Sequence, residues 1–288
     1  MTSVAEALRR GMDLLAPTVD DIAGLEARLL LQKALGRSPV WIYQSFQEPI
    51  SPADLARYER LLRARTLGEP LSYLVGQREF YGATFLVDSR VLIPRAESEV
   101  LIELALAWAR QNSLVQARLG EIVDVGTGSG ALAIALAREL PAARLLAVDC
   151  SADALAVVRL NALRLGVADR VSPVQGNLVD WLGTQAQLIV ANLPYIPSEE
   201  LARLSPELLR EPRLALDGGP DGLDPYRELF RQAATILAPA GVLFAEIAQD
   251  QGHAAADLAR ASFSGRDVKV YPDLEGRDRV VEIGPGRP

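Results

Sequence analysis

Apolar residues recur at helical spacing through the start of the chain and predict a small all-helical domain over residues 1–68. One helix is expected over Val19–Leu35. The next helix has clearer limits, because Ser51 is a favoured N-cap residue and Pro52 suits the first helical position. Gly68 follows its last apolar position and is a typical helix stop.

Residues 69–95 break this helical pattern. Two short β-like runs, Arg78–Tyr81 and Thr84–Asp88, flank Gly82 and predict a β-hairpin. We therefore expect this segment to connect the helical domain to a second domain.

From residue 96 to residue 288, helical and strand-like segments alternate, which predicts an α/β domain. It should open with a helix over Glu97–Arg110. Strand-like apolar runs follow at Ile122–Val125, Leu145–Asp149, Val171–Gln175, Leu188–Ala191 and Val242–Ile247. Helical stretches separate them at Gly130–Glu139, Ser151–Leu165 and Pro225–Leu237.

The last two strand-like runs, Asp267–Tyr271 and Arg279–Ile283, are joined by a short polar loop. The loop leaves no room for a crossover helix, so these strands should be antiparallel. Five parallel strands followed by an antiparallel hairpin resemble the seven-stranded, Rossmann-like domain of S-adenosylmethionine (SAM) methyltransferases. A plain dinucleotide-binding domain does not normally end in this way.

Composition excludes some classes of protein. With 49% hydrophobic residues, the chain lacks the signature of disorder. The 30 basic and 37 acidic residues give a net charge of −7, which argues against a large nucleic-acid surface. The arginines of 57–65 and 159–170 are interleaved with acids and leucines.

A single cysteine, Cys150, and a single histidine, His253, limit the available chemistry. No intrachain disulfide can form, Cys- or His-rich zinc sites are absent, and we expect no metal. His253 lies in a helix-like stretch and should be structural or solvated, and Cys150 should be a small packed residue beside Asp149. No secretory signal or apolar run long enough for a membrane helix is evident, so a cytoplasmic protein without membrane partners is expected.

A glycine-rich loop is predicted between the first strand and the next helix. Glycines there let the backbone turn sharply and approach a ligand. With Ala131 the spacing also fits a relaxed nicotinamide fingerprint, but the acid two residues before the first glycine favours SAM, whose methionine ammonium suits nearby carboxylates. The expected cofactor-binding residues here are Asp124, Gly126, Thr127, Gly128, Ser129 and Gly130.

Asp149 closes the next strand, nineteen residues beyond Gly130. A carboxylate at this position can accept hydrogen bonds from both ribose hydroxyls of either cofactor. Ser151, just after it, is also an ordinary candidate for a helix N-cap.

The strand Leu188–Ala191 ends in the tetrapeptide Asn192-Leu193-Pro194-Tyr195. Ligand sites of open α/β sheets lie beyond the carboxyl ends of the strands. Asn-x-Pro-Tyr there is typical of methyltransferases that act on a planar, conjugated nitrogen, which is a poor nucleophile. The Asn192 side-chain oxygen and the Leu193 carbonyl can each accept one N–H and hold the nitrogen in line with the methyl group. Pro194 restrains Leu193, and Tyr195 offers a ring face for the planar group. The four residues are therefore the expected catalytic residues, and Asn192 is also expected to contact the cofactor.

Nearly the whole chain resembles the release-factor glutamine methyltransferase family (PrmC/HemK). The matching segments are GEPLSYLVGQREFYG (68–82), VLIPRAESE (91–99), DVGTGSGALAIALA (124–137), ANLPYIP (191–197), EPRLALDGGPDGLD (211–224) and YPDLEGRDRVV (271–281). The resemblance implies SAM as cofactor and an N-terminal helical domain that docks the protein substrate. It also implies methylation of the glutamine in the Gly-Gly-Gln (GGQ) motif of peptide-chain release factors.

Two positions depart from the family pattern. Leu193 stands where the family has proline, so the accepting carbonyl remains but the loop is less rigid. Asn177 and Leu178 stand where many relatives carry an acid and an aromatic residue. They are expected to contact the adenine through an amide and an apolar side chain.

Other functions remain open. Asn-Leu-Pro-Tyr also occurs in ribosomal-RNA adenine dimethyltransferases, which keeps a nucleic-acid adenine N6-methyltransferase as an alternative. The acidic composition opposes it, and no direct nucleic-acid substrate is expected. A glutamine methyltransferase acting on a ribosomal protein is a second alternative. A noncatalytic adaptor that retains the SAM-binding fold is a third, which the intact Asn192 and Tyr195 disfavour.

Overall fold

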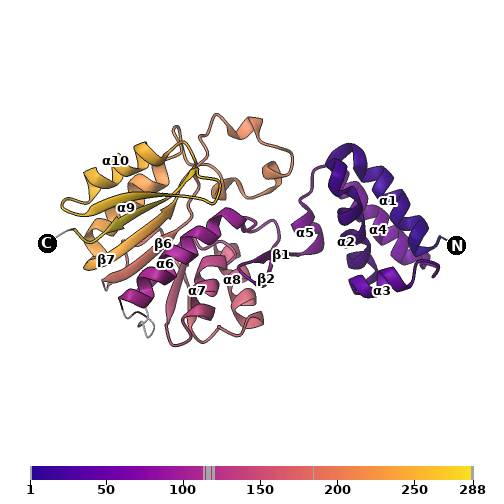
Figure 1. Cartoon of the computed structure of the whole chain (residues 1–288), viewed down its shortest axis with the longest axis horizontal. Coiled ribbons are helices and arrows are strands. Elements are labelled where there is room, and N and C mark those ends of the chain that lie inside the picture. The colour runs from indigo at the N-terminus through magenta and orange to yellow at the C-terminus, as the bar shows by residue number, and fades with distance from the viewer. Residues whose placement is uncertain (1, 113, 115–117, 119–120, 184, 287–288) are drawn as a thin grey trace. The chain divides into compact units, whose positions relative to one another are not determined.

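The computed structural model describes residues 2–112, 114, 118, 121–183 and 185–286. The chain forms two compact units (Figure 1). The first contains residues 1–77 together with 204–210, and the second contains residues 78–203 and 211–288.

The first unit is helical. Its helices are α1 (Val4–Val19), α2 (Ala23–Leu35), α3 (Pro39–Gln44), α4 (Pro52–Thr66) and α5 (Leu71–Val75). The helix predicted over Val19–Leu35 is shorter than expected, because Asp20–Ile22 form a 3₁₀ turn and Asp20 has a positive φ of 40°. Helix α4 begins as predicted: the Ser51 hydroxyl accepts a hydrogen bond from the Asp54 N–H at 3.1 Å.

The core of the helical unit is centred on Tyr58, which is 1% exposed. Its hydroxyl donates to the Ala27 carbonyl at 3.1 Å and so links α4 to α2. A Cβ atom at Gly11 of α1 would lie 2.0 Å from the Tyr58 hydroxyl oxygen. Glycine is therefore required where α1 passes this tyrosine.

Residues 204–210 belong to the helical unit, although they come from the middle of the other unit's sequence. The buried guanidinium of Arg65 donates to both carboxylate oxygens of Glu26, at 2.6 and 2.9 Å, and also pairs with Glu207. The Leu67 carbonyl accepts a hydrogen bond from Arg210 at 3.3 Å. These polar contacts hold the returning segment against α2 and α4.

The second unit contains the predicted two-stranded sheet, β1 (Gln77–Phe80) with β2 (Ala83–Leu86), and a larger sheet. The larger sheet contains β3 (Ile122–Val125), β4 (Leu145–Asp149), β5 (Val171–Gln175), β6 (Ala186–Ala191), β7 (Leu237–Glu246), β8 (Asp267–Pro272) and β9 (Asp278–Gly284). The N–H groups of Gly126 and Thr127 donate to the Val148 carbonyl, so β4 lies beside β3. The strand order is therefore β5-β4-β3-β6-β7-β9-β8.

Strand directions confirm the predicted α/β class. Strand β6 is parallel to β3 and β7, β4 is parallel to β5, and β9 is antiparallel to both β7 and β8. Strand β7 starts five residues earlier than predicted, because Leu237 pairs with Ala186 across an irregular register. The terminal hairpin follows from the short loop, as expected.

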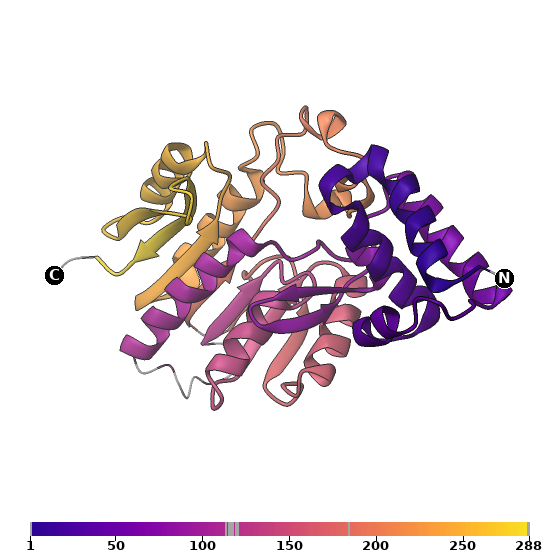
Figure 2. The same ribbon diagram turned by 45° about the vertical axis from the view of Figure 1, so that its right-hand side comes forward.

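Helices cover both faces of this sheet (Figures 1 and 2). One cluster of buried residues joins α6 (Glu99–Gln111), α7 (Ala131–Glu139) and α8 (Ala152–Arg164) to the sheet, and a second joins α9 (Asp224–Ile236) and α10 (Gly252–Ser262). Along β7, Val242 and Phe244 belong to the first cluster, whereas Leu243 and Ala245 belong to the second. Alternate side chains along each strand therefore pack against the helices on opposite faces of the sheet.

Candidate active site

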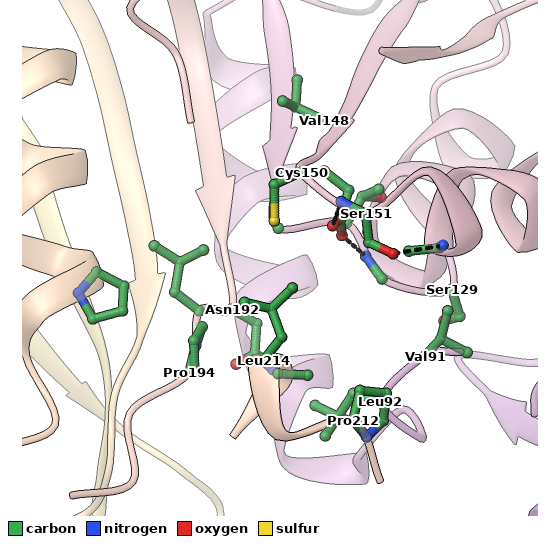
Figure 3. A pocket seen from close by; sticks show the side chains of 18 of the residues that line it. Val91, Leu92, Ser129, Val148, Cys150, Ser151, Asn192, Pro194, Pro212 and Leu214 are labelled. Atoms are coloured by element: carbon green, nitrogen blue, oxygen red, sulfur yellow. Dashed lines mark hydrogen bonds between the residues drawn. The ribbon is translucent and has the colours of Figure 1, made fainter. Parts of the chain in front are cut away.

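A cavity of about 380 Å³ lies beyond the carboxyl ends of β3, β4 and β6, within the second unit. Figure 3 draws many of the side chains that line it, with Asn192 and Pro194 toward one side in that view and Ser129 and Ser151 toward the other. The predicted residues that line it are Gly126, Thr127, Gly128, Ser129, Asp149, Asn177, Leu178, Asn192, Leu193 and Pro194. The structure therefore brings most of the predicted site together at one edge of the sheet.

The glycine-rich loop connects β3 to α7. Gly126, Gly128 and Gly130 all have positive φ angles, of 71°, 54° and 83°. A Cβ atom at Gly126 would lie 2.6 Å from Leu193 Cδ2, so glycine is also needed for close packing there. Gly130 does not line the cavity but forms the N-cap of α7.

Asp124 lies beneath this loop and is fully buried. Its Oδ2 accepts hydrogen bonds from Thr127 Oγ1 at 2.6 Å and from the Ala133 N–H at 3.0 Å, while Oδ1 has no partner among the described residues. Burial raises the pKa of this carboxyl to about 7, against the lowering effect of its two hydrogen bonds. The unpartnered oxygen suits a hydrogen-bond donor such as a bound ammonium group.

Asp149 ends β4 and lines the cavity beside the loop. Its Oδ2 accepts from the Gly128 N–H and its Oδ1 from the Ser151 N–H, both at 2.9 Å. A carboxylate oxygen can accept more than one hydrogen bond, so both oxygens retain capacity for ribose hydroxyls. Ser151 also caps α8, with its hydroxyl accepting from the Ala154 N–H at 3.1 Å.

The single cysteine and the single histidine lie in different surroundings. Cys150 is exposed, so the expectation of a packed residue is wrong: the chain turns outward after β4, and Cys150 lines the cavity beside Asp149. His253 is solvated, as expected, with a side chain 91% exposed next to Asp257 on α10. Within the described part of the chain, no group of three or more His, Cys, Asp or Glu residues could hold a metal ion.

Asn177 and Leu178 form another part of the cavity wall. Leu178 has a φ of 59°, a left-handed conformation that is costly for leucine. The indole of Trp181 donates to the Leu178 carbonyl at 3.0 Å, and a Cβ at Gly176 would lie 2.3 Å from the same indole nitrogen. Trp181 therefore holds this segment in the conformation that presents it to the cavity.

Asn192 directly follows β6. Its Nδ2 donates to Ser98 Oγ at 3.1 Å and to Glu246 Oε2 at 3.0 Å. The Leu193 carbonyl accepts from the buried hydroxyl of Tyr226 at 2.9 Å, and the same hydroxyl lies 2.5 Å from the Glu246 backbone carbonyl. Because burial raises the pKa of Tyr226 well above its ordinary value, this hydroxyl stays protonated and can donate.

Tyr195 is half-buried and, unlike Asn192, is absent from the cavity wall. Burial, together with the nearby charge of Glu246, raises its pKa to about 12. Its carbonyl accepts from Gln251 Nε2 at 3.0 Å, which fixes the backbone where the chain leaves the site.

Sequence reasoning missed the residues that support this tetrapeptide: Ser98, Glu246 and Tyr226. An acid at the end of the apolar run VLFAE was a detectable signal, since a carboxylate in a buried strand requires a partner. It also missed parts of the wall contributed by Val91, Leu92, Pro94, Pro212 and Leu214, although these lie in the segments 91–99 and 211–224 that carry the family resemblance.

The strand order and the glycine loop with its two acids define a SAM-dependent methyltransferase. Residues 111–220 match the family model described as the methyltransferase small domain, and residues 6–76 match that of the PrmC N-terminal domain. Over 278 residues the chain is 43% identical to the release factor glutamine methyltransferase of Moorella thermoacetica, covering 96% of this chain and 95% of that protein. It is 42% identical over 281 residues to the corresponding protein of Cereibacter sphaeroides, covering 96% of each.

The chain therefore belongs to the release factor glutamine methyltransferase family and is an enzyme. Among solved structures, the ribosomal protein L11 methylase of Lactobacillus delbrueckii is similar in fold, with a TM-score of 0.50 and 19% identity over 70% of this chain and 84% of that chain. At this identity the likeness concerns the fold alone. Among the described residues, no helix is long and apolar enough to cross a membrane.

Proposed function

We propose that this enzyme transfers the methyl group of SAM to the side-chain amide nitrogen of the glutamine in the GGQ motif of peptide-chain release factors. The names of its relatives support a release factor as substrate. The observation that carries the proposal is the presence of Asn192 and Leu193 on the cavity wall, next to the glycine loop.

The cofactor fits the residues on the other side of the cavity. Asp149 would accept the ribose hydroxyls, Asn177 and Leu178 would contact the adenine, and the loop of Gly126–Gly130 above Asp124 would hold the methionine end. The buried Asp124 oxygen that accepts no hydrogen bond from any described residue agrees with this assignment. When bound, SAM supplies an electrophilic methyl group on a sulfonium.

The protein's own contribution to the reaction is to orient the amide. An amide nitrogen is weakly nucleophilic because its lone pair is delocalised into the carbonyl group. Asn192 Oδ1 and the Leu193 carbonyl would each accept one N–H of the glutamine and hold its nitrogen in line with the methyl group. Forming the N–C bond breaks the methyl–sulfur bond and leaves the nitrogen positively charged, so one N–H proton then passes to water.

Mass spectrometry of the product tests this function. Purified release factor, incubated with enzyme and SAM, should gain a single 14 Da increment that fragmentation places on the GGQ glutamine. A release factor with that glutamine replaced by glutamate is the matched control and should gain nothing. No increment, or an increment at another residue, would overturn the proposal.

The same assay separates the alternative substrates. Methylated adenine in ribosomal RNA, without a release-factor product, would favour the reaction suggested by Asn-Leu-Pro-Tyr. Methylated glutamine in a ribosomal protein, again without a release-factor product, would favour the sister activity.

We further propose that the helical domain of residues 1–68 docks the release factor, with residues 69–95 as connector to the methyltransferase domain of residues 96–288. Apolar side chains from α1 to α2 that remain about half exposed support this role: Met12, Leu14, Ile22 and Leu25 are 44–50% exposed. Replacing Ile22 and Leu25 by serine should raise KM for intact release factor about tenfold and leave KM for a short GGQ peptide unchanged. Equal effects on both substrates would contradict docking by this surface.

A further inference from the structure

Glu246 is a buried acid whose carboxylate contacts the proposed acceptor-binding residue. The register of β6 against β7 pairs Val190 with Phe244 and Ala191 with Ala245, so the next positions, Asn192 and Glu246, lie side by side where the strands end. Side chains at every second position of a strand lie on the same face, so Glu246 lies on the face of β7 that also carries Val242 and Phe244. This face packs against the layer that contains α6. Its side chain is 1% exposed.

Both hydrogens of the Asn192 amide are used within this buried group. One is donated to Glu246 Oε2 at 3.0 Å and the other to Ser98 Oγ at 3.1 Å, and Ser98 in turn hydrogen-bonds to Glu246. An ionised carboxylate can only accept hydrogen bonds, so it fixes which end of the amide faces inward. No described residue donates to Asn192 Oδ1, which is left available to the cavity.

The carboxylate of Glu246 does not line the cavity. It lies one amide group away from the place where the target nitrogen would sit. Methyl transfer moves positive charge from the sulfonium to that nitrogen, and a nearby buried anion stabilises developing positive charge more than it stabilises a neutral amide. A carboxylate on the N–H side of Asn192 also makes its oxygen a stronger acceptor, because linked hydrogen bonds polarise one another.

We propose that Glu246, together with Ser98, is a positioning residue for methyl transfer: it holds the Asn192 amide with its oxygen toward the acceptor nitrogen and places a negative charge behind it. The proposal rests on the proposed function, since it takes an amide nitrogen as the acceptor. The tetrapeptide alone is then not sufficient for methyl transfer, because Asn192 can orient the acceptor nitrogen only when the Glu246 carboxylate lies behind it.

Other charged or titratable groups surround Glu246 from each neighbouring element. Arg279 of β9 favours its ionised form, whereas Glu97, just before α6, opposes it. Tyr195 after β6 and Tyr226 of α9 are also close enough to feel its charge. Burial is the largest influence and raises the pKa of Glu246 to about 7. Because the proposed role needs the ionised carboxylate, the rate of methyl transfer at saturating SAM should rise as pH increases through about 7.

Four variants test the proposal with single-turnover rates at saturating SAM. Glu246→Ala removes both the contact and the charge and should slow transfer about a hundredfold, the scale for one lost preorganised contact. Glu246→Gln keeps an oxygen that can accept from Asn192 but removes the charge, so it should cost about tenfold. Ser98→Ala, which leaves the second Asn192 hydrogen without its acceptor, should also cost about tenfold. Phe244→Leu, on the same strand and face, controls for disturbed packing and should stay within about twofold.

Two further readouts separate positioning from a merely structural role. The affinity for SAM should be unchanged in all four variants, and the rise in rate near pH 7 should be absent from Glu246→Gln. Any one of three results would overturn the proposal. These are a transfer rate in Glu246→Ala no lower than in Phe244→Leu, a loss of affinity for SAM that parallels the loss of rate, and a pH profile in Glu246→Gln that matches the wild type. If Glu246→Ala does not fold, Glu246→Gln and Ser98→Ala still decide the outcome. Failure of the proposed function is distinct, because the wild-type enzyme itself would then leave the GGQ glutamine unmethylated.

Discussion

A buried carboxyl lies behind each end of the cavity, and burial raises the pKa of both to about 7, yet the two are used differently. Asp124, at the cofactor end, holds the glycine loop through one oxygen, and its other oxygen has no hydrogen-bond partner among the residues that the structure describes. Glu246, at the acceptor end, is engaged with the side chains of Asn192 and Ser98. One acid supports the loop that would hold the cofactor, whereas the other organises a residue that would contact the substrate.

This difference suggests that binding of SAM and activation of the acceptor are physically separable. Asp149 and the glycine loop come from β3 and β4, while Asn192 and Glu246 come from β6 and β7. Variants at one end should therefore change affinity for SAM, and variants at the other should change the rate of transfer.

The largest effect is expected at the acceptor end. Asn192→Ala removes one of the two proposed acceptors of the glutamine N–H groups and should lower the single-turnover rate by roughly a hundredfold or more. The affinity for SAM, measured by calorimetry, should change less than threefold. Asn112→Ala, an exposed asparagine after α6, is the control and should be silent in both assays. An active Asn192→Ala enzyme would mean that the amide is held elsewhere.

At the cofactor end, Asp149→Ala should weaken SAM binding by about 1.5–3 kcal/mol, the value of hydrogen bonds to a charged group. This corresponds to roughly a 10- to 150-fold higher Kd. Asp169→Ala, which removes an exposed acid before β5, should leave Kd unchanged. Unaltered affinity in Asp149→Ala, or tight binding of NAD by the wild type, would count against the cofactor assignment.

The raised pKa values also predict how stability depends on pH. Above about pH 5 and below about pH 7 the unfolded chain carries mostly ionised carboxylates at 124 and 246, whereas the folded protein keeps them mostly protonated. The unfolded state then binds fewer protons, so the free energy of unfolding should fall as pH rises, by at most about 1.4 kcal/mol per pH unit for each group. Chemical denaturation of the SAM-free enzyme at pH 5, 6, 7 and 8 measures this slope. Asp124→Asn and Glu246→Gln should each flatten it, and an unchanged slope in both would show that these groups are ionised when folded.

The smallest effect is expected for Leu193→Pro, which restores the residue usual in the family. The carbonyl that accepts from Tyr226 remains, and the loop becomes stiffer. Activity should be preserved or rise by about twofold, although the contact between Leu193 and the loop at Gly126 is lost. Steady-state kinetics with intact release factor provide the measurement, and a dead Leu193→Pro enzyme would show that this contact matters more than loop stiffness.

The sequence was sufficient to predict the alternation of helices and strands in the second unit and the part of the cavity wall that comes from the glycine loop and the ends of β4 and β6. Strands β3, β4 and β5 have the predicted limits, and for β3 and β4 the reason is that continuous apolar runs bounded by turns and helices mark buried parallel strands. Asn192 and Asp149 were identifiable for a related reason: a polar residue directly after such a run lies at the edge of the sheet where ligands bind.

The supporting contacts could not be predicted in the same way. Ser98 and Glu246 lie 94 and 54 positions from Asn192, and their contacts depend on the register of β6 against β7 and on the start of α6. The return of residues 204–210 to the helical unit rests on contacts between residues far apart in the sequence, such as the ion pair of Arg65 with Glu207 and the hydrogen bond from Arg210 to the Leu67 carbonyl, which no local pattern reveals.

The most direct test of the account measures two constants, the Kd for SAM and the single-turnover rate at saturating SAM, on both Asp149→Ala and Asn192→Ala. We predict that each variant changes one constant and leaves the other nearly unchanged. Asp149→Ala should raise Kd at least about tenfold with a rate within about threefold of wild type. Asn192→Ala should do the reverse, with a rate roughly a hundredfold lower and a Kd within about threefold of wild type. If both variants change both constants by similar factors, the two ends of the cavity are not separable and the account is wrong.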